Sequence, residues 1–388
     1  MTIRVYDDKI RFTTGGTDID LEIDSDGLRF TKPIRIASNV SFTLPSQGTP
    51  PAMGGLGNNI FHSGGFALNA PLYHDKSIDR FPGANLSGTA TDVGDIISPS
   101  NGRIYAQTQH SSTSSGFTTS NYSPSIFASA DGIFKFPFAI SSGTGSEVAS
   151  VANAHATGAG HSTYDTGYVS GGSQAPGYST SEKFPFAISS GTASSVGSLS
   201  TARNSGSQQT QSTVKGYMAQ GRDPTNSNYE ITTIEVITFA NDNISTFPTN
   251  LVNNSPATSP YAPSGSRAYI SIGGFSSKED AYYGGGRPSS SAPNSYVFAY
   301  NTIRRTPFSS DNVIETGSGG NLSPAKHSWT GASTPTVGAI MGGYYPVGFG
   351  SPHTMTDNVD KFNFSSFSNS SDVASLTLAK VTGAGHQD

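Results

Sequence analysis

Basic side chains recur at one position of a repeated segment, and they are the residues whose spacing could do chemistry. His155, Arg203 and Lys380 each stand seven residues after a valine in a segment rich in Ser, Val and Leu. Arg267 opens the corresponding segment of another repeat unit. If the units are arranged in a ring, these four side chains would surround one mouth of a central channel. Such a ring of donors would suit anionic or hydroxyl-rich ligands such as glycans.

The recurrence also has a structural interpretation, which we favour. Equivalent positions in repeat proteins often hold neighbouring units together, for example by hydrogen bonds to backbone carbonyls. His161 and His386 stand in matching Gly-Ala-Gly-His segments, and this repetition indicates packing rather than ligand binding. Trp329, Tyr344 and Tyr345 could stack on sugar rings, although burial between repeat units is the alternative that we favour.

A ten-residue segment that occurs twice indicates the architecture that positions these residues. KFPFAISSGT stands at 135–144 and again at 183–192. When the chain is aligned on Phe138 and Phe186, it contains six units of about 50 residues, a period typical of kelch-type β-propeller blades. The weaker copies align at Gly83, Phe239, Phe298 and Phe364.

A second motif predicts the strands of each unit. An apolar or aromatic segment that ends in glycine precedes the phenylalanine segment, as in GYVSGG (167–172) and AYYGGG (281–286). Glycine allows φ above zero and a close approach of backbones. Period-two alternation and few helix formers predict an all-β chain with four strands per blade. Variable recognition is expected in the divergent loops 224–230 and 346–354.

The two ends of the repeat region predict that the ring closes. The last unit ends in VTGAGH (381–386), which matches ATGAGH (156–161), but it lacks its own Gly-Gly strand. An unassigned strand with two glycines lies at 58–66, before the first unit. We expect this N-terminal strand to pair with the C-terminal strand and close a six-bladed propeller, because closure removes two exposed sheet edges.

The first 45 residues have a different composition. They hold 13 charged residues, and in 18–24 acids alternate with Ile and Leu as in a strand with one acidic and one apolar face. We predict a β-strand attachment and oligomerisation module at 1–45, a Pro/Gly linker at 46–57 and the propeller at 58–388. The alternative is a solvated charged edge that blocks aggregation. The candidate attachment residues are Asp18, Asp20, Glu22, Asp24, Arg29 and Arg35.

Charge and cysteine content argue against several classes of function. The net charge is −5 and no Lys/Arg run occurs, so we expect no nucleic-acid binding. The chain has no cysteine, which excludes disulfides and thiolate metal sites. The segment DIDLEIDSDG resembles a calcium loop, but no Glu stands at the twelfth position, and we expect no metal and no cofactor. No apolar run suggests a signal sequence or membrane insertion.

The wording of the repeat resembles a known group of proteins. The unit that joins GYVSGG to SEKFPFAISSGTASSVGSLSTAR is similar to degenerate kelch repeats, and especially to propeller repeats in virion structural proteins of marine bacteriophages such as cyanophages. The resemblance covers 58–388. It implies a tail-fibre-like or head-fibre-like virion protein, assembled in the host bacterial cytoplasm. Its N-terminal module would bind other virion proteins, its propeller could bind host surface glycans, and we expect a homo-oligomer, with a trimer favoured.

Two other classes of function stay open beside this expectation. A polysaccharide-degrading propeller would need two carboxylates facing one glycosidic bond, and the acids after residue 45 form no such pattern. The motifs of propeller oxidases and sialidases are also missing, so we predict no catalytic residues and no enzymatic activity. A generic protein-interaction propeller is the third class, because one fold hosts many functions.

Overall fold

The computed structural model shows an all-β chain in two compact units, Met1–Gln47 and Gly48–Asp388. It describes residues 2–5, 9–14, 17–24, 27–30, 59–67, 74–82, 86–96, 108–123, 128–172, 179–204, 210–223, 225, 229–250, 269–270, 272–288, 299–310, 320–345 and 354–388. In the first unit it describes the strands by their backbone only. A search of the described residues finds no helix suited to crossing a membrane.

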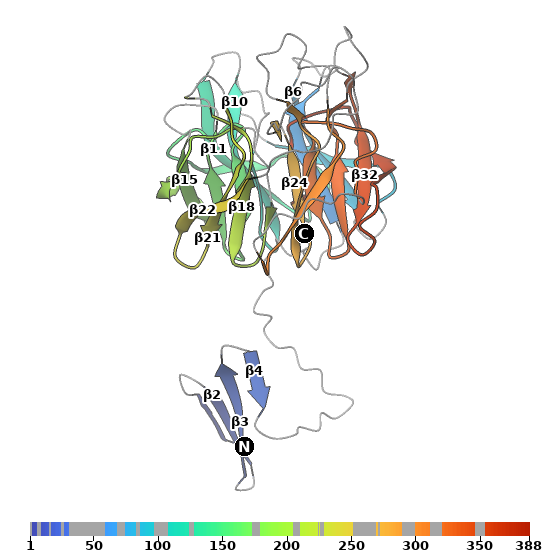
Figure 1. Cartoon of the computed structure of the whole chain (residues 1–388). Coiled ribbons are helices and arrows are strands. Elements are labelled where there is room, and N and C mark those ends of the chain that lie inside the picture. Colours follow the sequence, from blue (N-terminus) through green and yellow to red (C-terminus); the bar gives the residue numbers. More distant parts are fainter. Residues whose placement is uncertain are drawn as a thin grey trace. The chain divides into compact units, whose positions relative to one another are not determined.

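The second unit is a six-bladed β-propeller, as the sequence predicts (Figure 1). Its blades are small antiparallel sheets, named here in chain order from the inner to the outer strand. Blades 1 to 3 are β34 (Ala384–Gln387), β5 (Asn59–Phe66), β6 (His74–Pro82), β8 (Thr91–Asp95); β9 (Thr108–Ser111), β10 (Ser115–Ser123), β11 (Ala128–Pro137), β12 (Ser146–Ser150); and β13 (Ala159–Ser162), β14 (Thr166–Ser170), β15 (Thr180–Pro185), β16 (Ser194–Ser198).

The remaining three blades follow the same order, and blade 5 shows three strands in the described residues. Blades 4 to 6 are β17 (Thr210–Gln211), β18 (Lys215–Ala219), β21 (Thr233–Thr238), β22 (Asn243–Asn250); β24 (Gly273–Ser276), β25 (Asp280–Gly284), β27 (Ile303–Pro307); and β28 (Thr330–Ser333), β29 (Val337–Met341), β32 (Asn358–Asn363), β33 (Ser371–Ser375). Short two-stranded ribbons accompany the sheets of blades 4 to 6: β19 (Arg222–Asp223) with β20 (Tyr229–Glu230), β23 (Tyr269–Ile270) with β26 (Arg287–Pro288), and β30 (Tyr344–Tyr345) with β31 (Thr354–Met355).

Blade 1 closes the ring with strands from both ends of the repeat region. β34 pairs antiparallel with β5, so that Ala384 stands opposite Ser63. The Asn59 amide and backbone N–H both donate to the Asp388 carboxylate, at 2.6 and 2.8 Å. In Figure 1 the blue strand β6 accordingly lies among the orange and red strands of the C-terminal region. The predicted closure is therefore confirmed.

The six inner strands lie side by side around the axis, and one circle of hydrogen bonds joins them. At the same strand position in every blade, a backbone N–H donates to the side-chain oxygen of the equivalent residue in the next blade, at 2.7–3.3 Å. We call these six bonds the inner belt. They run from Ser111 to Ser162, Gln211, Ser276, Ser333, Gln387 and back to Ser111.

Glycine precedes the belt by two positions in four of the inner strands, because the backbones approach closely there. A Cβ on Gly331 would lie 2.0 Å from the Gly274 carbonyl oxygen, and one on Gly385 would lie 2.2 Å from that of Gly331. Blade 2 carries Gln109 at this position instead. Its side chain crosses the centre, donating to the Gly331 carbonyl at 3.3 Å and accepting from the Gly385 N–H.

The repeated phenylalanines join each blade to the one before it. Phe138 stacks on Phe61 of blade 1 at 5.1 Å between ring centroids, and Phe186 stacks on Phe117 of blade 2 at 4.8 Å. Three further interfaces have the same contact: Tyr168–Phe239, Tyr217–Phe308 and Tyr282–Phe364. Blade 5 thus uses Phe308, and the alignment on Phe298, which lies outside the described residues, was wrong for this contact.

The end of the repeated segment makes a second contact with the preceding blade. Thr144 and Thr192 form parallel bridges with the last residues of the outer strands β8 and β12. β7 (Gly88–Thr89) pairs in the same parallel manner with β33 of blade 6. Both halves of the decamer, the aromatic half and the Ser-Gly-Thr half, thus contact the preceding blade, and this shared role explains why the segment recurs.

The first unit is a four-stranded antiparallel meander. Its strands β1 (Thr2–Val5), β2 (Lys9–Thr14), β3 (Thr17–Asp24) and β4 (Gly27–Phe30) pair in chain order. The alternation of acids and apolar residues in 18–24 does form a strand. Arg35 lies outside the described residues.

Truncation after Ala379 should abolish cooperative folding of the propeller. It removes β34, breaks the inner belt at Gln387 and exposes the edge of β5, so we expect a loss above about 5 kcal/mol, comparable to the whole stability of a domain. Asp388→Ala is the matched control, because it keeps β34 and removes only the bonds to Asn59, for a loss of about 1–2 kcal/mol. Thermal and urea unfolding measure both, and wild-type stability in the truncated chain would contradict the closure.

Candidate functional site

The cationic residues predicted to surround the channel mouth are buried. His155, Arg203 and Lys380 lie in the connectors that lead into β13, β17 and β34, and they are 0, 3 and 0 % exposed. Arg267 lies outside the described residues. The structure adds Lys326, which is 0 % exposed and holds the equivalent place before β28. The four blades that carry these residues therefore share one buried cation position.

Each buried cation pairs with a carboxylate in the third strand of its own blade. The nitrogen-to-oxygen distances are 2.8–3.3 Å, and the acids are completely buried. We call the basic residue at the cation position, its acid and the connector that carries the basic residue a blade clamp. The four pairs are His155–Glu182, Arg203–Glu235, Lys326–Asp360 and Lys380–Asp79.

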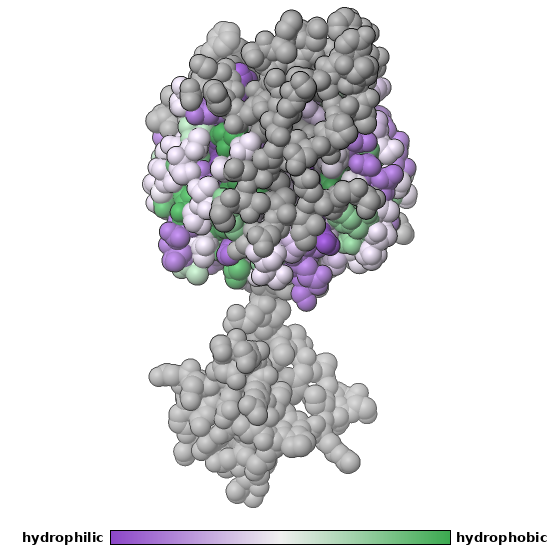
Figure 2. Space-filling model, in the orientation of Figure 1, coloured by the Kyte–Doolittle hydropathy of each residue, from purple (hydrophilic) through white to green (hydrophobic). Residues whose placement is uncertain are grey.

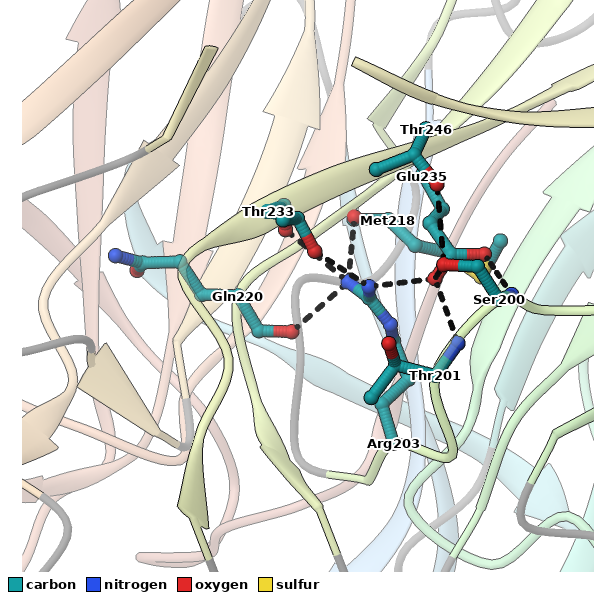
Figure 3. A network of polar contacts seen from close by, with 8 residues as sticks. All are labelled: Ser200, Thr201, Arg203, Met218, Gln220, Thr233, Glu235 and Thr246. Carbon is teal, nitrogen blue, oxygen red and sulfur yellow. Dashed lines mark hydrogen bonds and ion pairs between the residues drawn. The ribbon is translucent and has the colours of Figure 1, made fainter. Parts of the chain in front are cut away.

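Arg203 shows how a clamp satisfies the two terminal nitrogens of its guanidinium (Figure 3). One terminal nitrogen donates to the backbone carbonyls of Met218, Gln220 and Thr233 at 3.0–3.2 Å. The other donates to the Thr233 hydroxyl and to Glu235, at 3.1 and 2.9 Å. These acceptors lie on β18 and β21 or directly after β18, so the guanidinium ties the connector to both central strands of blade 4.

The carboxylates also organise the connector. Glu182 accepts from the Ala152 N–H at 2.6 Å, and Glu235 accepts from the Ser200 N–H at 2.9 Å. In blade 1, Asp79 accepts from the Thr377 hydroxyl at 2.6 Å. Each of these donors stands three residues before the cation of its clamp. One acid therefore fixes both the start of the connector and the cation at its end.

The Gly-Gly motif of the preceding blade completes the clamp. Gly172 and Gly343 each donate their N–H to the carbonyl of the next cation, Arg203 or Lys380, at 2.8 and 3.0 Å. Their φ values of 142° and 110° favour glycine, as the sequence predicts. A Cβ on Gly342 would lie 2.2 Å from the Lys380 carbonyl oxygen. The clamp therefore stabilises the contact between blades as well as the blade itself.

Burial disfavours the charged forms in the clamps, and the outcome differs from one clamp to another. In the Lys326–Asp360 pair, burial lowers the pKa of Lys326 and raises the pKa of Asp360, and the mutual attraction at 3.0 Å only partly offsets it. At Asp75, burial is outweighed by Lys380 and Ser77, which hold the pKa of that carboxyl below its ordinary value. These groups are suited to holding structure, because removing either partner leaves a charge in an apolar interior.

Two blades depart from the clamp pattern. Phe134 holds the carboxylate position in blade 2, and Arg304 holds it in blade 5. Arg304 is 4 % exposed and lines a small cleft with Gln220, Tyr283 and Thr302. Its charge is opposite to that of the acids in the other blades, so blade 5 is the described part of the propeller where the local chemistry differs most from the repeat.

The sequence carried a signal that would have identified Lys326. Each described clamp has the pattern Leu or Val, two residues, Ala and a cation, as in LSTAR (199–203), LSPAK (322–326) and LTLAK (376–380). The spacing from an upstream valine misses Lys326, because blade 5 has no described outer strand with that valine. Counting back seven residues from the inner-belt residue finds His155, Lys326 and Lys380, whereas Arg203 stands eight residues before Gln211. The binding role predicted for His155, Arg203 and Lys380 stays a prediction, while their contacts are those of the structural interpretation.

The other singled-out residues are also in contacts within the propeller. Trp329 is 4 % exposed and packs on Phe275 at 6.0 Å between ring centroids. Tyr344 stacks on His327 at 5.3 Å, and burial raises its pKa. Burial, rather than exposure to sugars, is therefore the state of Trp329. Most of loops 224–230 and 346–354 lies outside the described residues.

Three buried histidines stand one position before the inner-belt residues Gln387, Ser111 and Ser162, and the rings of His386 and His110 pack on Phe136 and Phe184 of the next blade. His386 and His110 each place Nδ1 3.0 Å from the backbone carbonyl of the following histidine in the series His386, His110, His161. Burial lowers the pKa of His110 to about 4 and those of His161 and His386 to about 3. His62, behind β34, is shifted in the same direction for the same reason. The repeated histidines of the GAGH segments are thus packing residues.

The candidate attachment residues occupy one face of the N-terminal sheet. Asp20 stands opposite Arg11, and Glu22 stands opposite both Lys9 and Arg29. Two of the four acids of β3 therefore have cations directly opposite on their own sheet, whereas Asp18 and Asp24 stand opposite Thr13 and Gly27. In the residues described, no group of three or more His, Cys, Asp or Glu is arranged to hold a metal ion.

No family model matches the chain, and no curated protein matches its sequence significantly.

Replacing Lys326 by Met should cost about 3–5 kcal/mol of unfolding free energy, because Asp360 would be left charged or protonated in a dry site. The double variant Lys326→Met/Asp360→Leu should return to within about 1 kcal/mol of wild type, since an apolar pair can replace a buried ion pair and blade 2 already has Phe134 there. Urea denaturation measures both. A double variant as unstable as the single one would contradict the clamp.

Stability should fall as the pH drops from about 6.5 toward 4.5. The folded-state pKa values of His110, His161 and His386 lie below 6.5, so the unfolded chain binds more protons in this window. Each histidine then contributes a loss of up to about 1.4 kcal/mol per pH unit. His161→Thr should reduce this slope, because it removes one of the three histidines. Blade 4 carries Thr210 at the same position, so we expect the fold to accept this substitution. An unchanged slope in unfolding experiments would mean that the histidines do not control it.

Proposed function

We propose that the chain is a structural protein of a bacteriophage particle. Residues 1–45 attach it to other virion proteins, and the propeller is displayed outward to adhere to the host surface. The protein is assembled in the bacterial cytoplasm and works on the released particle. The sequence resemblance of the repeats to marine phage virion proteins suggests this class, and the architecture gives it physical support.

The observation that carries the proposal is the division into two units of different chemistry. A separate four-stranded sheet with one charged face precedes the large polar propeller in the sequence. An attachment module can bind a particle without disturbing a display domain only if the two fold as separate units. This arrangement is what an adhesive fibre protein requires.

The propeller has the properties of a durable display domain. Its blades close into a ring, which leaves only the outer described strand of each blade as an edge that could pair with other proteins. Over the described residues in Figure 2, hydrophilic and weakly polar side chains dominate the visible surface. Among described large hydrophobic residues, Tyr164, Val214 and Leu378 are exposed. A polar surface keeps such a domain soluble at the high local density of a particle.

We infer that the recognition face lies at one end of the sheets. In each blade the second-to-third-strand loop and the connector to the next inner strand emerge at the same end of the sheets. These segments include the divergent loops 224–230 and 346–354. Loops on a rigid ring are the usual place for variable binding residues. We place host adhesion, with a surface glycan as the ligand class, at this end of the propeller.

Immunogold electron microscopy of phage particles from a producing culture tests the proposal. Antibodies raised against the full chain should label a defined site on intact particles. Antibodies against peptide 1–30 should label only particles from which the neighbouring virion proteins have been removed, because those proteins would cover this segment. Fluorescent full-length protein should bind host cells and lose binding after glycan removal by periodate. If the chain is absent from purified particles while present in cell lysate, the virion assignment is wrong.

A further inference from the structure

The register of the N-terminal sheet sorts its residues into two unlike faces. Residues directly opposite one another in paired strands share a face, and neighbours along a strand alternate. Ile3 stands opposite Phe12, which stands opposite Ile19, and Val5, Ile10, Leu21 and Phe30 form a second row. One face therefore contains nine apolar residues, with Thr14 and Thr17 beside the β2–β3 turn: Ile3, Val5, Ile10, Phe12, Ile19, Leu21, Ile23, Leu28 and Phe30.

The other face is internally complementary in charge. Arg11 is paired in register with Asp20, and Glu22 lies between Lys9 and Arg29. Opposite charges directly across a sheet stabilise it, and such a face is compatible with water. The apolar face is not, since nine large apolar residues together exceed what a small monomeric domain leaves exposed. The sheet therefore needs a partner on the apolar face.

The size of that face fits a protein interface. Transfer energies of Val, Leu, Ile and Phe correspond to roughly 60–120 Å² of apolar surface per side chain, so nine residues offer on the order of 500–1,000 Å². A stable interface buries about 800 Å² per partner. The described strands of the unit form a single layer, and a module of this length rarely supplies a second layer of its own.

We propose that this apolar face binds the same face of another copy of the chain, so that the N-terminal sheets assemble into the core of a homo-oligomer. Two such sheets can pack face to face at about 10 Å, with interdigitated side chains. The inference deepens the proposed function by naming the surface through which copies associate. It leaves the row Asp18, Asp20, Glu22 and Asp24, on the opposite face, for contacts with other virion proteins.

The oligomeric state of the purified full chain is the first test. Light scattering coupled to size-exclusion chromatography should give a mass of at least two chains down to micromolar concentration. Phe12→Lys should shift the protein to monomers, whereas Thr13→Lys, its neighbour on the charged face opposite Asp18, should leave the oligomer intact. Thermal unfolding of the propeller should be the same in all three proteins. A monomeric wild-type chain overturns the proposal, whatever covers the face instead.

Cysteine cross-linking then identifies the face without a disruptive charge. The chain has no cysteine, so a single substitution reports only contacts between copies. Phe12→Cys treated with a short bismaleimide should give dimers in denaturing gels with several-fold higher yield than Thr13→Cys. The reverse order overturns the proposal even if the chain is oligomeric, because the copies would then meet through the charged face. Both tests use purified protein, so they can succeed or fail independently of the particle labelling that tests the proposed function.

Discussion

The propeller depends on a circle of six hydrogen bonds around its axis. Each bond of the inner belt joins a backbone N–H to a side-chain oxygen of the next blade, and the circle is complete only when all six inner strands are in place. These donors are buried, and a buried N–H without an acceptor costs about 1–3 kcal/mol. The belt therefore couples the blades: loss of one inner strand leaves unsatisfied groups in two neighbours. Glycines beside the belt and Gln109 across the centre follow from the same close approach.

The clamps stabilise the contacts between blades away from the axis, as the belt does at the axis. The residue types at the clamp positions vary more than those of the belt. His, Lys or Arg is the basic residue of the clamp, and Asp or Glu is the acid. In three of the four clamps the acid also accepts from the residue three positions before the basic residue, whereas in the fourth, Lys326–Asp360, the Ser323 N–H donates to Ser370 instead. Because a buried pair and an apolar pair are close in stability, a blade can exchange one for the other, as Phe134 indicates. The clamp position thus tolerates change that the belt position does not.

The parts of this fold that share a sequence motif from blade to blade could be predicted. The parts that are equivalent only in their position in the structure could not. The duplicated decamer, the Gly-Gly strands and the matching GAGH segments are specific enough to reveal six blades and their closure through 58–66. The inner belt uses Ser and Gln, which are common throughout the chain, so no pattern distinguishes Ser276 or Gln387 from their neighbours. Phe308 was missed because unit five has drifted in length, and Lys326 because its upstream valine is absent. In the N-terminal module, the acidic alternation predicted β3, but the cations opposite it become visible only once the register pairs Arg11 with Asp20.

The shared construction of blade 1 makes the order of synthesis matter. Ser63 and Ala384, whose groups meet in that blade, are 321 positions apart in the chain. On a ribosome that adds about 5–20 residues per second, β5 waits on the order of tens of seconds for its partner. Blades 2 to 6 can pair their own strands as they emerge. The edge of β5 that pairs with β34 stays open until β34 has been made. The nascent chain is thus an incomplete ring with one unpaired strand edge until β34 has been synthesised, and such an edge is open to chaperones or to other copies of the chain during that time.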